Sequence, residues 1–272
     1  MTGSTPERFD TSAPAASRRY NSWLGGKDNF APDRASADQI AQAFPPIRAA
    51  AAQNRRCLER MVRYLAAECG ISQFLDVGCG LPLGTLVHEI AQEVVPQARI
   101  VYVDNDPLVA VHARALMLES PEGEAAFYGG DLREPQLILE AARGMLDFSQ
   151  PIGLLLAAVL HFLPDTAEAL DAVRELVAAL PSGSHVALTH ATYDPLPENQ
   201  RAALDSFAKP DSAAGPFQPR SRGEVAAFLA GMDLVAPGLV STIRWRPELQ
   251  PPADLQLSET DAVCYAAVAV KR

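Results

Sequence analysis

The strongest constraint on the fold of this chain lies between residues 73 and 104. Two short apolar runs end here in acidic residues: Gln73-Phe74-Leu75-Asp76-Val77-Gly78-Cys79-Gly80 and Val101-Tyr102-Val103-Asp104. Parallel α/β sheets build nucleotide-sized pockets from such segments, because ligands bind at the carboxyl ends of the strands. Glycines let the backbone come close to a ligand, and Asp104 is placed to accept hydrogen bonds from ribose hydroxyls. The sequence therefore predicts a pocket for a nucleotide-like ligand.

Asp76, two residues before the first glycine, distinguishes between cofactors. A dinucleotide site must leave room at this position for a pyrophosphate dianion, which a carboxylate would repel. A carboxylate is more stable beside a cationic ligand. S-adenosylmethionine carries an ammonium and a sulfonium charge, so we expect this cofactor and not NAD.

Composition limits the partners and the location of the protein. A net charge of −10 disfavours a nucleic-acid substrate, because phosphate binding needs a basic surface, although a local arginine cluster would escape this argument. The start of the chain lacks the apolar core of a signal peptide, and the longest apolar run, Ile152 to Leu163, is too short to cross a bilayer. We therefore expect a cytoplasmic protein without a membrane partner, and its oligomeric state stays open. Four scattered cysteines predict reduced thiols and no metal site: Cys57, Cys69, Cys79 and Cys264.

From residue 73 onward, apolar runs alternate with amphipathic segments, which is typical of a doubly wound, mostly parallel α/β sheet. We predict a disordered tail over residues 1–17, a lid and helices over 18–72, and the main domain over 73–272, with an insertion near 194–220. Seven strands are expected, at 73–77, 99–103, 125–128, 152–159, 184–190, 238–245 and 263–270. Helices are expected at 33–44, 46–69, 84–94, 107–118, 134–146, 166–179, 197–207 and 222–231.

Residues 18–30 fit neither helix nor strand periodicity, and they combine Tyr20, Trp23 and Phe30 with Gly25-Gly26 and a polar stretch. One interpretation is a loop that the aromatic residues hold against the core. The other is a lid over the pocket, in which aromatic rings exclude water from the sulfonium and polar groups reach the charged end of the cofactor. Both interpretations remain open from the sequence.

Five segments resemble, in order, the motifs of class I S-adenosylmethionine-dependent methyltransferases. They are 76–80, Asp104, Gly130-Asp131-Leu132, 156–162 and 180–184. The resemblance implies a Rossmann-like fold in which the turn of Asp76, Gly78 and Gly80 lies under the methionine part of the cofactor. It implies that Asp104 holds the ribose and that Asp131 faces the adenine amino group. The remaining candidate cofactor contacts are Asn105, Leu132 and Ala157.

A closer resemblance includes the N-terminal part. Tyr20, residues 24–30, Asp33 and Gln53-Asn54-Arg55 resemble an actinobacterial S-adenosyl methyltransferase family first catalogued as a domain of unknown function. This resemblance spans nearly the whole chain. It implies further cofactor contacts from Tyr20, Lys27 and Arg55, and it implies no particular methyl acceptor.

His161, which follows the expected strand 152–159, is the candidate catalytic residue, because imidazole titrates near neutral pH. The alternative interpretation is a packed, hydrogen-bonded histidine that shapes the pocket. The sequence thus favours a methyltransferase acting on a small molecule. A catalytically silent protein that binds S-adenosylmethionine is the alternative, and Asp76 opposes a nicotinamide oxidoreductase.

Overall fold

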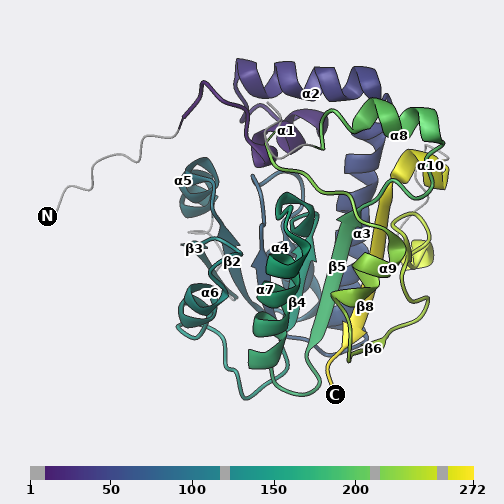
Figure 1. The fold of residues 1–272 in the computed structure, drawn as a ribbon. Coiled ribbons are helices and arrows are strands. Elements are labelled where there is room, and N and C mark those ends of the chain that lie inside the picture. Colours follow the sequence, from purple (N-terminus) through teal and green to yellow (C-terminus); the bar gives the residue numbers. More distant parts are fainter. Residues whose placement is uncertain (1–9, 117–122, 209–214, 250–256) are drawn as a thin grey trace, which may run out of the picture.

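The computed structural model describes residues 10–116, 123–208, 215–249 and 257–272. Within them lies one sheet of eight strands in the order β3-β2-β1-β4-β5-β8-β6, with β7 also paired to β8. The expected doubly wound, mostly parallel fold is confirmed (Figure 1). The strands are β1 (Gln73–Val77), β2 (Arg99–Asp104), β3 (Glu124–Gly129), β4 (Gly153–Ala157), β5 (His185–Ala191), β6 (Asp233–Leu234), β7 (Val240–Ser241) and β8 (Cys264–Val270).

The pairing of the strands places the predicted motifs at one edge of the sheet. Strand β1 lies between β2 and β4 and is parallel to both, with Leu75 opposite Val101 and Leu154. Strand β5 continues the parallel order beside β4. Because parallel strands end at the same edge, the segments after β1, β2 and β4 meet there. Strand β8 is antiparallel to β5 and pairs Cys264 with Ala191.

Successive side chains of a strand point to opposite faces of the sheet, and an apolar layer covers each face. Leu154 packs with α6 (Pro135–Ala142), α7 (Thr166–Ala179) and α9 (Arg222–Ala227). The next residue, Leu155, points to the opposite face and packs with α3 (Ile47–Ala67) and α4 (Val87–Val94). Helix α5 (Pro107–Leu116) follows β2, and the last two residues of its expected range, 117–118, lie outside the described residues.

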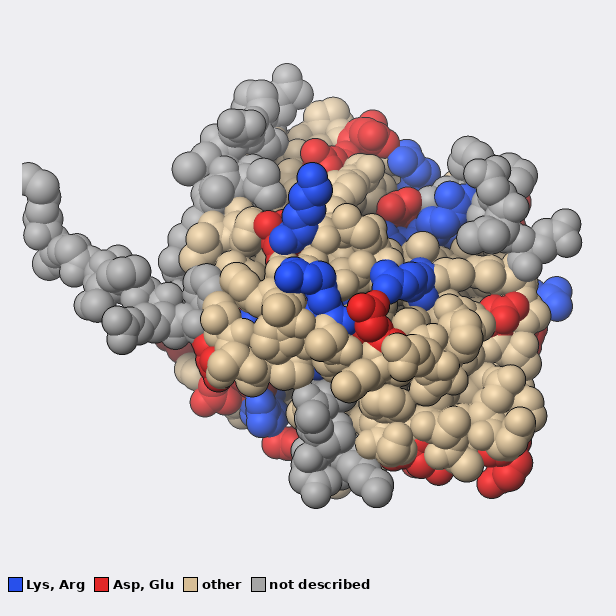
Figure 2. Space-filling model, turned by 90° about the horizontal axis from the view of Figure 1, so that it is seen from above, with Lys and Arg blue, Asp and Glu red and all other residues tan. Residues whose placement is uncertain are grey.

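A helical layer crosses the carboxyl edge of the parallel strands (Figure 1). It contains α1 (Ala16–Trp23), α2 (Ala31–Ala43), α8 (Glu198–Leu204) and α10 (Glu259–Ala262). Seen from above this layer, Lys and Arg side chains alternate with Asp and Glu on a largely uncharged surface (Figure 2). No described helix is both long enough and apolar enough to span a bilayer.

The prediction that residues 18–30 have no regular structure is wrong for residues 18–23, which belong to α1. Helix α1 has the sequence ASRRYNSW, and its buried positions are Arg18, Arg19 and Asn21. Burial of these polar side chains leaves no apolar stripe for a pattern to detect. Of the expected tail, residues 1–9 lie outside the described part, whereas Ala15 donates its N–H to Asp33 (2.8 Å) and Ala16 begins α1.

The strand predicted over 238–245 is reduced to Val240–Ser241. Only Val240 and Ser241 pair with β8, whereas Leu239 is buried in the layer of α6, α7 and α9, and Trp245 is buried in the layer of α3. Trp245 is fully buried and meets Tyr64 edge to face. Arg60 donates to the carbonyls of Trp245 (2.8 Å) and Thr242 (2.6 Å), which holds the segment in an irregular path. The short 3-10 helices η2 (Leu160–Phe162) and η3 (Pro247–Leu249) complete the described elements.

Candidate functional site

A cavity of about 600 Å³ lies at the carboxyl edge of β1, β2 and β4, beneath α1. The structure does not bring Lys27 to this cavity: its side chain is exposed, and it is absent from the described lining. Eleven predicted site residues do line it: Tyr20, Arg55, Asp76, Gly78, Gly80, Asp104, Asn105, Asp131, Leu132, Ala157 and His161.

The turn after β1 requires glycine. Gly78 has φ of 76°, and a Cβ placed there would lie 2.3 Å from Cγ2 of Val159. Its N–H donates to the carbonyl of Val103 (2.7 Å), so the turn is fixed to the end of β2. At Gly80 the space beside Cα is open within 4 Å, which leaves the backbone accessible from the cavity.

Asp104 and Asp76 are buried carboxyl groups at the ends of neighbouring strands. Asp104 accepts hydrogen bonds from the N–H groups of Gly80 (2.8 Å) and Asp106 (2.9 Å), yet burial raises its pKa to about 6. Burial raises the pKa of Asp76 to about 7, while the Arg55 cation opposes this shift and Asp104 adds to it. A positively charged ligand would stabilise both ionised carboxylates.

Arg55 reaches this pair from α3. Its Nη2 donates to the carbonyl of Thr85, and its Nε lies 4.0 Å from Glu59 in an i,i+4 pair. The Nε is buried and has no hydrogen-bond partner among the described residues. The cavity therefore presents a cation and a carboxylate close together, which suits a ligand carrying both charges.

Asp131 is held by its neighbours. Its Oδ1 accepts from the backbone N–H (2.9 Å) and Nε (2.9 Å) of Arg133, and its Oδ2 accepts from Nη2 of Arg133 (2.7 Å) and Nδ2 of Asn105 (2.9 Å). These bonds, led by those from Arg133, lower the pKa of Asp131 to about 2. A carboxylate offers about four acceptor positions, so a contact with adenine would require one donor to leave.

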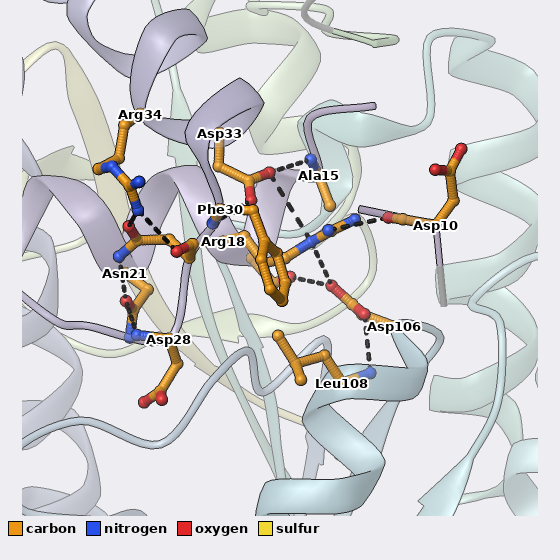
Figure 3. Close-up of polar contacts among 12 residues, drawn as sticks. Asp10, Ala15, Arg18, Asn21, Asp28, Phe30, Asp33, Arg34, Asp106 and Leu108 are labelled. Atoms are coloured by element: carbon orange, nitrogen blue, oxygen red, sulfur yellow. Dashed lines mark hydrogen bonds and ion pairs between the residues drawn. The ribbon is translucent and has the colours of Figure 1, made fainter. Parts of the chain in front are cut away.

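Helix α1 is anchored directly to the loop after β2 (Figure 3). Ser17 donates its hydroxyl to Oδ2 of Asp106, and Nε of Arg18 lies 3.6 Å from the same oxygen and 3.7 Å from Oδ1 of Asp33. Asp33 is fully buried and also accepts the N–H of Phe30 (2.8 Å). Residues of α1 therefore form a wall of the cavity that is anchored to α2 and to the loop after β2.

Tyr20 continues this wall toward α3. Its hydroxyl donates to the carbonyl of Ala51 (2.9 Å) and accepts from Nδ2 of Asn54 (3.0 Å). Burial raises the pKa of Tyr20 to about 12, so the phenol stays neutral. Tyr20 thereby joins α1 to the helix that carries Arg55.

His161 lies on η2 and is nearly fully buried. Its ring lies between Phe162 and Phe217, at centroid distances of 4.5 and 5.1 Å. Its Nδ1 accepts the N–H of Ala191 (3.3 Å), so the neutral ring carries its proton on Nε2. Burial, reinforced by His190 and Arg220, holds the pKa of His161 well below the usual value.

Arg220 and His190 form a hydrogen-bond network beside His161. Nδ1 of His190 donates to the carbonyl of Ala191 (2.7 Å), which leaves Nε2 to accept from Nη1 of Arg220 (3.0 Å). Arg220 also donates to the carbonyls of Leu160 (3.0 Å), the first residue of η2, and Leu163 (2.7 Å), which follows η2. Both residues therefore hold the loop after β4 in place.

The far part of the cavity is apolar. Side chains from α2, α8 and the segment after β5 gather there, and Phe217 stacks obliquely on Tyr193 at 6.4 Å. These residues could not be predicted as neighbours, because apolar side chains scattered over distant segments give no local pattern in the sequence. They are Ile40, Phe44, Tyr193, Leu204, Phe207 and Phe217.

The family model for S-adenosyl methyltransferases matches residues 2–272 of this chain. The chain belongs to this family. The methyltransferase is similar to a DUF574 family protein from Streptomyces avermitilis, at 36% identity and a TM-score of 0.90 over 97% of this chain and 100% of the other. It is also similar to a putative methyltransferase from Thermobifida fusca, at 38% identity and a TM-score of 0.85 over 97% of each chain. No curated protein matches it.

These comparisons confirm the family expected from the sequence and, with it, S-adenosylmethionine as the cofactor of this methyltransferase. The residues of the cavity fit that cofactor. Asp76 and Arg55 offer opposite charges at one end, and Gly80 leaves open space beside the backbone. No group of described residues has the composition of a metal site.

Proposed function

We propose that this methyltransferase methylates a small, largely apolar molecule that binds in the far part of the cavity. The observation that supports the proposal most directly is the continuity of the cavity. One space of about 600 Å³ is lined at one end by Gly80 and Asp104 and at the other by Tyr193 and Phe217. Pockets for small molecules have volumes of roughly 300–1,000 Å³ and mostly apolar walls.

In this proposal, the polar end of the cavity holds the cofactor. Asp104 accepts hydrogen bonds from the ribose, while Asp76 and Arg55 face the ammonium and carboxylate of the amino-acid part. Asn105 and Leu132 bound the adenine. This assignment is supported by the presence of both residues in the lining of the cavity.

The bound cofactor supplies an electrophilic methyl group and leaves as a neutral thioether. The chain's own contribution is then to align the acceptor and to exclude water. Ala158, next to the predicted contact Ala157, has φ of 55° and lines the cavity between its two ends. Its N–H donates to Oγ1 of Thr189 (2.9 Å), which fixes the strained turn against β5.

His161 orients the acceptor in this proposal and does not remove its proton. Its Nδ1 lone pair accepts from Ala191, and its Nε2 already carries a proton. An imidazole in that state can donate a hydrogen bond but cannot act as a general base.

Transfer of a labelled methyl group from S-adenosylmethionine to a panel of aromatic and aliphatic acceptors tests the proposal. We expect Asp104→Asn to weaken cofactor binding by about tenfold or more, because charge-assisted hydrogen bonds contribute roughly 1.5–3 kcal/mol each. Asp233→Asn is the matched control, since Asp233 pairs with Arg272 far from the cavity. Tight cofactor binding without turnover of any acceptor would favour the catalytically silent alternative.

A further inference from the structure

Arg19 is a buried cation on the cavity wall that the proposed function leaves unused. It is 4% exposed, and its Nε and Nη1 have no hydrogen-bond partner among the described residues. Isolated buried charges are costly, so such a group calls for a counter-charge. Burial and the neighbouring Arg18 cation lower the pKa of Arg19 to about 10, at which it is still charged at neutral pH.

The other charges of the wall are already matched. Asp33 is the carboxylate that acts on Arg19. Its oxygens, however, already accept hydrogen bonds from the N–H groups of Ala15 and Phe30, both at 2.8 Å, and its Oδ1 lies 3.7 Å from Nε of Arg18 in an ion pair. Arg133 is bound to Asp131. Arg19 therefore has a carboxylate within electrostatic range, but its Nε and Nη1 have no hydrogen-bond acceptor among the described residues.

The position of Arg19 separates it from the amino-acid end of the cofactor site. Arg19 lies one turn before Trp23 on α1, so the two residues share a face of this helix, and the carboxylate that acts on Arg19 is Asp33 on α2. The charge of Arg55 acts on Asp76, whereas Arg19 belongs to the α1–α2 side. The same side carries the apolar residues Trp23, Leu24 and Ile40.

We propose that Arg19 binds an anionic group of the methyl acceptor, so that the substrates of this enzyme are apolar or aromatic carboxylic acids. The inference rests on the proposed function, because it names the substrate class of the same cavity. One cation calls for one negative charge. A phosphate dianion would leave excess negative charge in a cavity that also contains Asp76, Asp104, Asp106 and Asp131.

The test uses the full chain saturated with S-adenosylhomocysteine and calorimetry with two acid–amide pairs. The pairs are naphthoic acid with naphthamide and phenylacetic acid with phenylacetamide. We expect each acid to bind about tenfold to a hundredfold more tightly than its amide. Arg19→Met should abolish this preference, Arg19→Lys should retain part of it, and both variants should keep their affinity for S-adenosylhomocysteine within about twofold.

Stability provides a readout that a structural role would not give. Replacing a buried cation that lacks hydrogen-bond partners by an apolar side chain of similar length is often neutral or stabilising. Arg19→Met should therefore melt no lower than the wild-type protein in the absence of ligand. A lower melting temperature would show that Arg19 has a partner within the protein, and this would overturn the inference.

Other outcomes of these measurements also test the role of Arg19. An acid preference that survives in Arg19→Met overturns the inference, as does a wild-type protein that binds neither acid or prefers inorganic phosphate. Loss of S-adenosylhomocysteine affinity in Arg19→Met would assign the residue to the cofactor instead. Acid binding that depends on Arg19, without methyl transfer to any acceptor, would support this site and refute the proposed function.

Discussion

Nε of Arg18 lies 3.6 Å from Oδ2 of Asp106, so an ion pair joins α1 to the loop that follows β2. The same nitrogen lies 3.7 Å from Asp33, which is fully buried. One guanidinium thus neutralises two carboxylates from segments far apart in the sequence. The N-terminal wall and the cofactor end of the cavity depend on each other through this contact.

Arg18→Ala should destabilise the protein by about 3–5 kcal/mol, because it breaks a buried ion pair by removing the guanidinium that Asp33 and Asp106 share. Urea unfolding measures the change, and hydrogen exchange locates it if only α1 and α2 open. Arg174→Ala is the matched control: its pair with Asp171 is largely exposed, and its removal should change stability by no more than about 0.5 kcal/mol. Equal effects of the two variants would contradict the coupling.

Gly78→Ala should abolish cofactor binding, because its Cβ would lie 2.3 Å from Cγ2 of Val159. Gly84→Ala separates this clash from backbone strain. Gly84 also has a positive φ, 65°, but nothing lies within 4 Å of its added Cβ, so only the left-handed cost of about 1–2 kcal/mol remains. Val159→Gly in the Gly78→Ala background removes Cγ2 and also Cβ of Val159, which would lie 2.7 Å from the added Cβ, and should restore part of the affinity measured by calorimetry. No recovery would mean that strain alone acts at Gly78.

Acid should affect the free and the cofactor-bound protein in opposite directions. The raised pKa values of Asp76, about 7, and Asp104, about 6, mean that the folded protein holds protons that the unfolded chain has released. Stability of the free protein therefore falls as pH rises from about 4 to about 7 through these groups. A cationic cofactor needs the ionised carboxylates, so its affinity should fall as pH drops below about 7. Melting curves with and without S-adenosylmethionine at pH 5.5 to 8.5 would check both trends, and a ligand-induced shift that is constant over this range would contradict them.

His161→Asn should retain turnover within about tenfold of the wild-type rate, because asparagine reproduces the acceptor that Nδ1 offers to Ala191. Loss of a general base would lower the rate by roughly a hundredfold to ten-thousandfold. The pH profile of the wild-type enzyme should also lack an inflection from this histidine near pH 6.5, since burial holds its pKa well below that value. A large loss with such an inflection would restore His161 as the base.

Much of the fold was predictable because local sequence determines it. The apolar runs that end at Asp76 and Asp104 form parallel neighbours, and their ends meet as the strand order requires. Trp245 shows the limit of this reasoning, because an apolar run is buried equally well by packing on a helix as by strand pairing. The sequence could not distinguish these two modes.

The site residues that come directly after strands could be predicted from the sequence, whereas the buried arginines of α1 could not. Arg18 is buried on a helix without an apolar face, because its ion pairs with Asp33 and Asp106, which are distant in sequence, make that burial possible. The adjacent pair of arginines before Tyr20 was the available signal. Lys27 was expected at the cavity on resemblance alone, and its side chain is exposed.

The antiparallel direction of β8 determines where a label can be attached to this enzyme. Its first residue, Cys264, lines the cavity, whereas Val270 pairs with His185 at the start of β5, at the opposite edge of the sheet. Arg272 follows there and is exposed (Figure 1). A dye or surface tether attached after Arg272 would therefore leave ligand entry unobstructed, which makes this end the natural attachment point for immobilised binding assays.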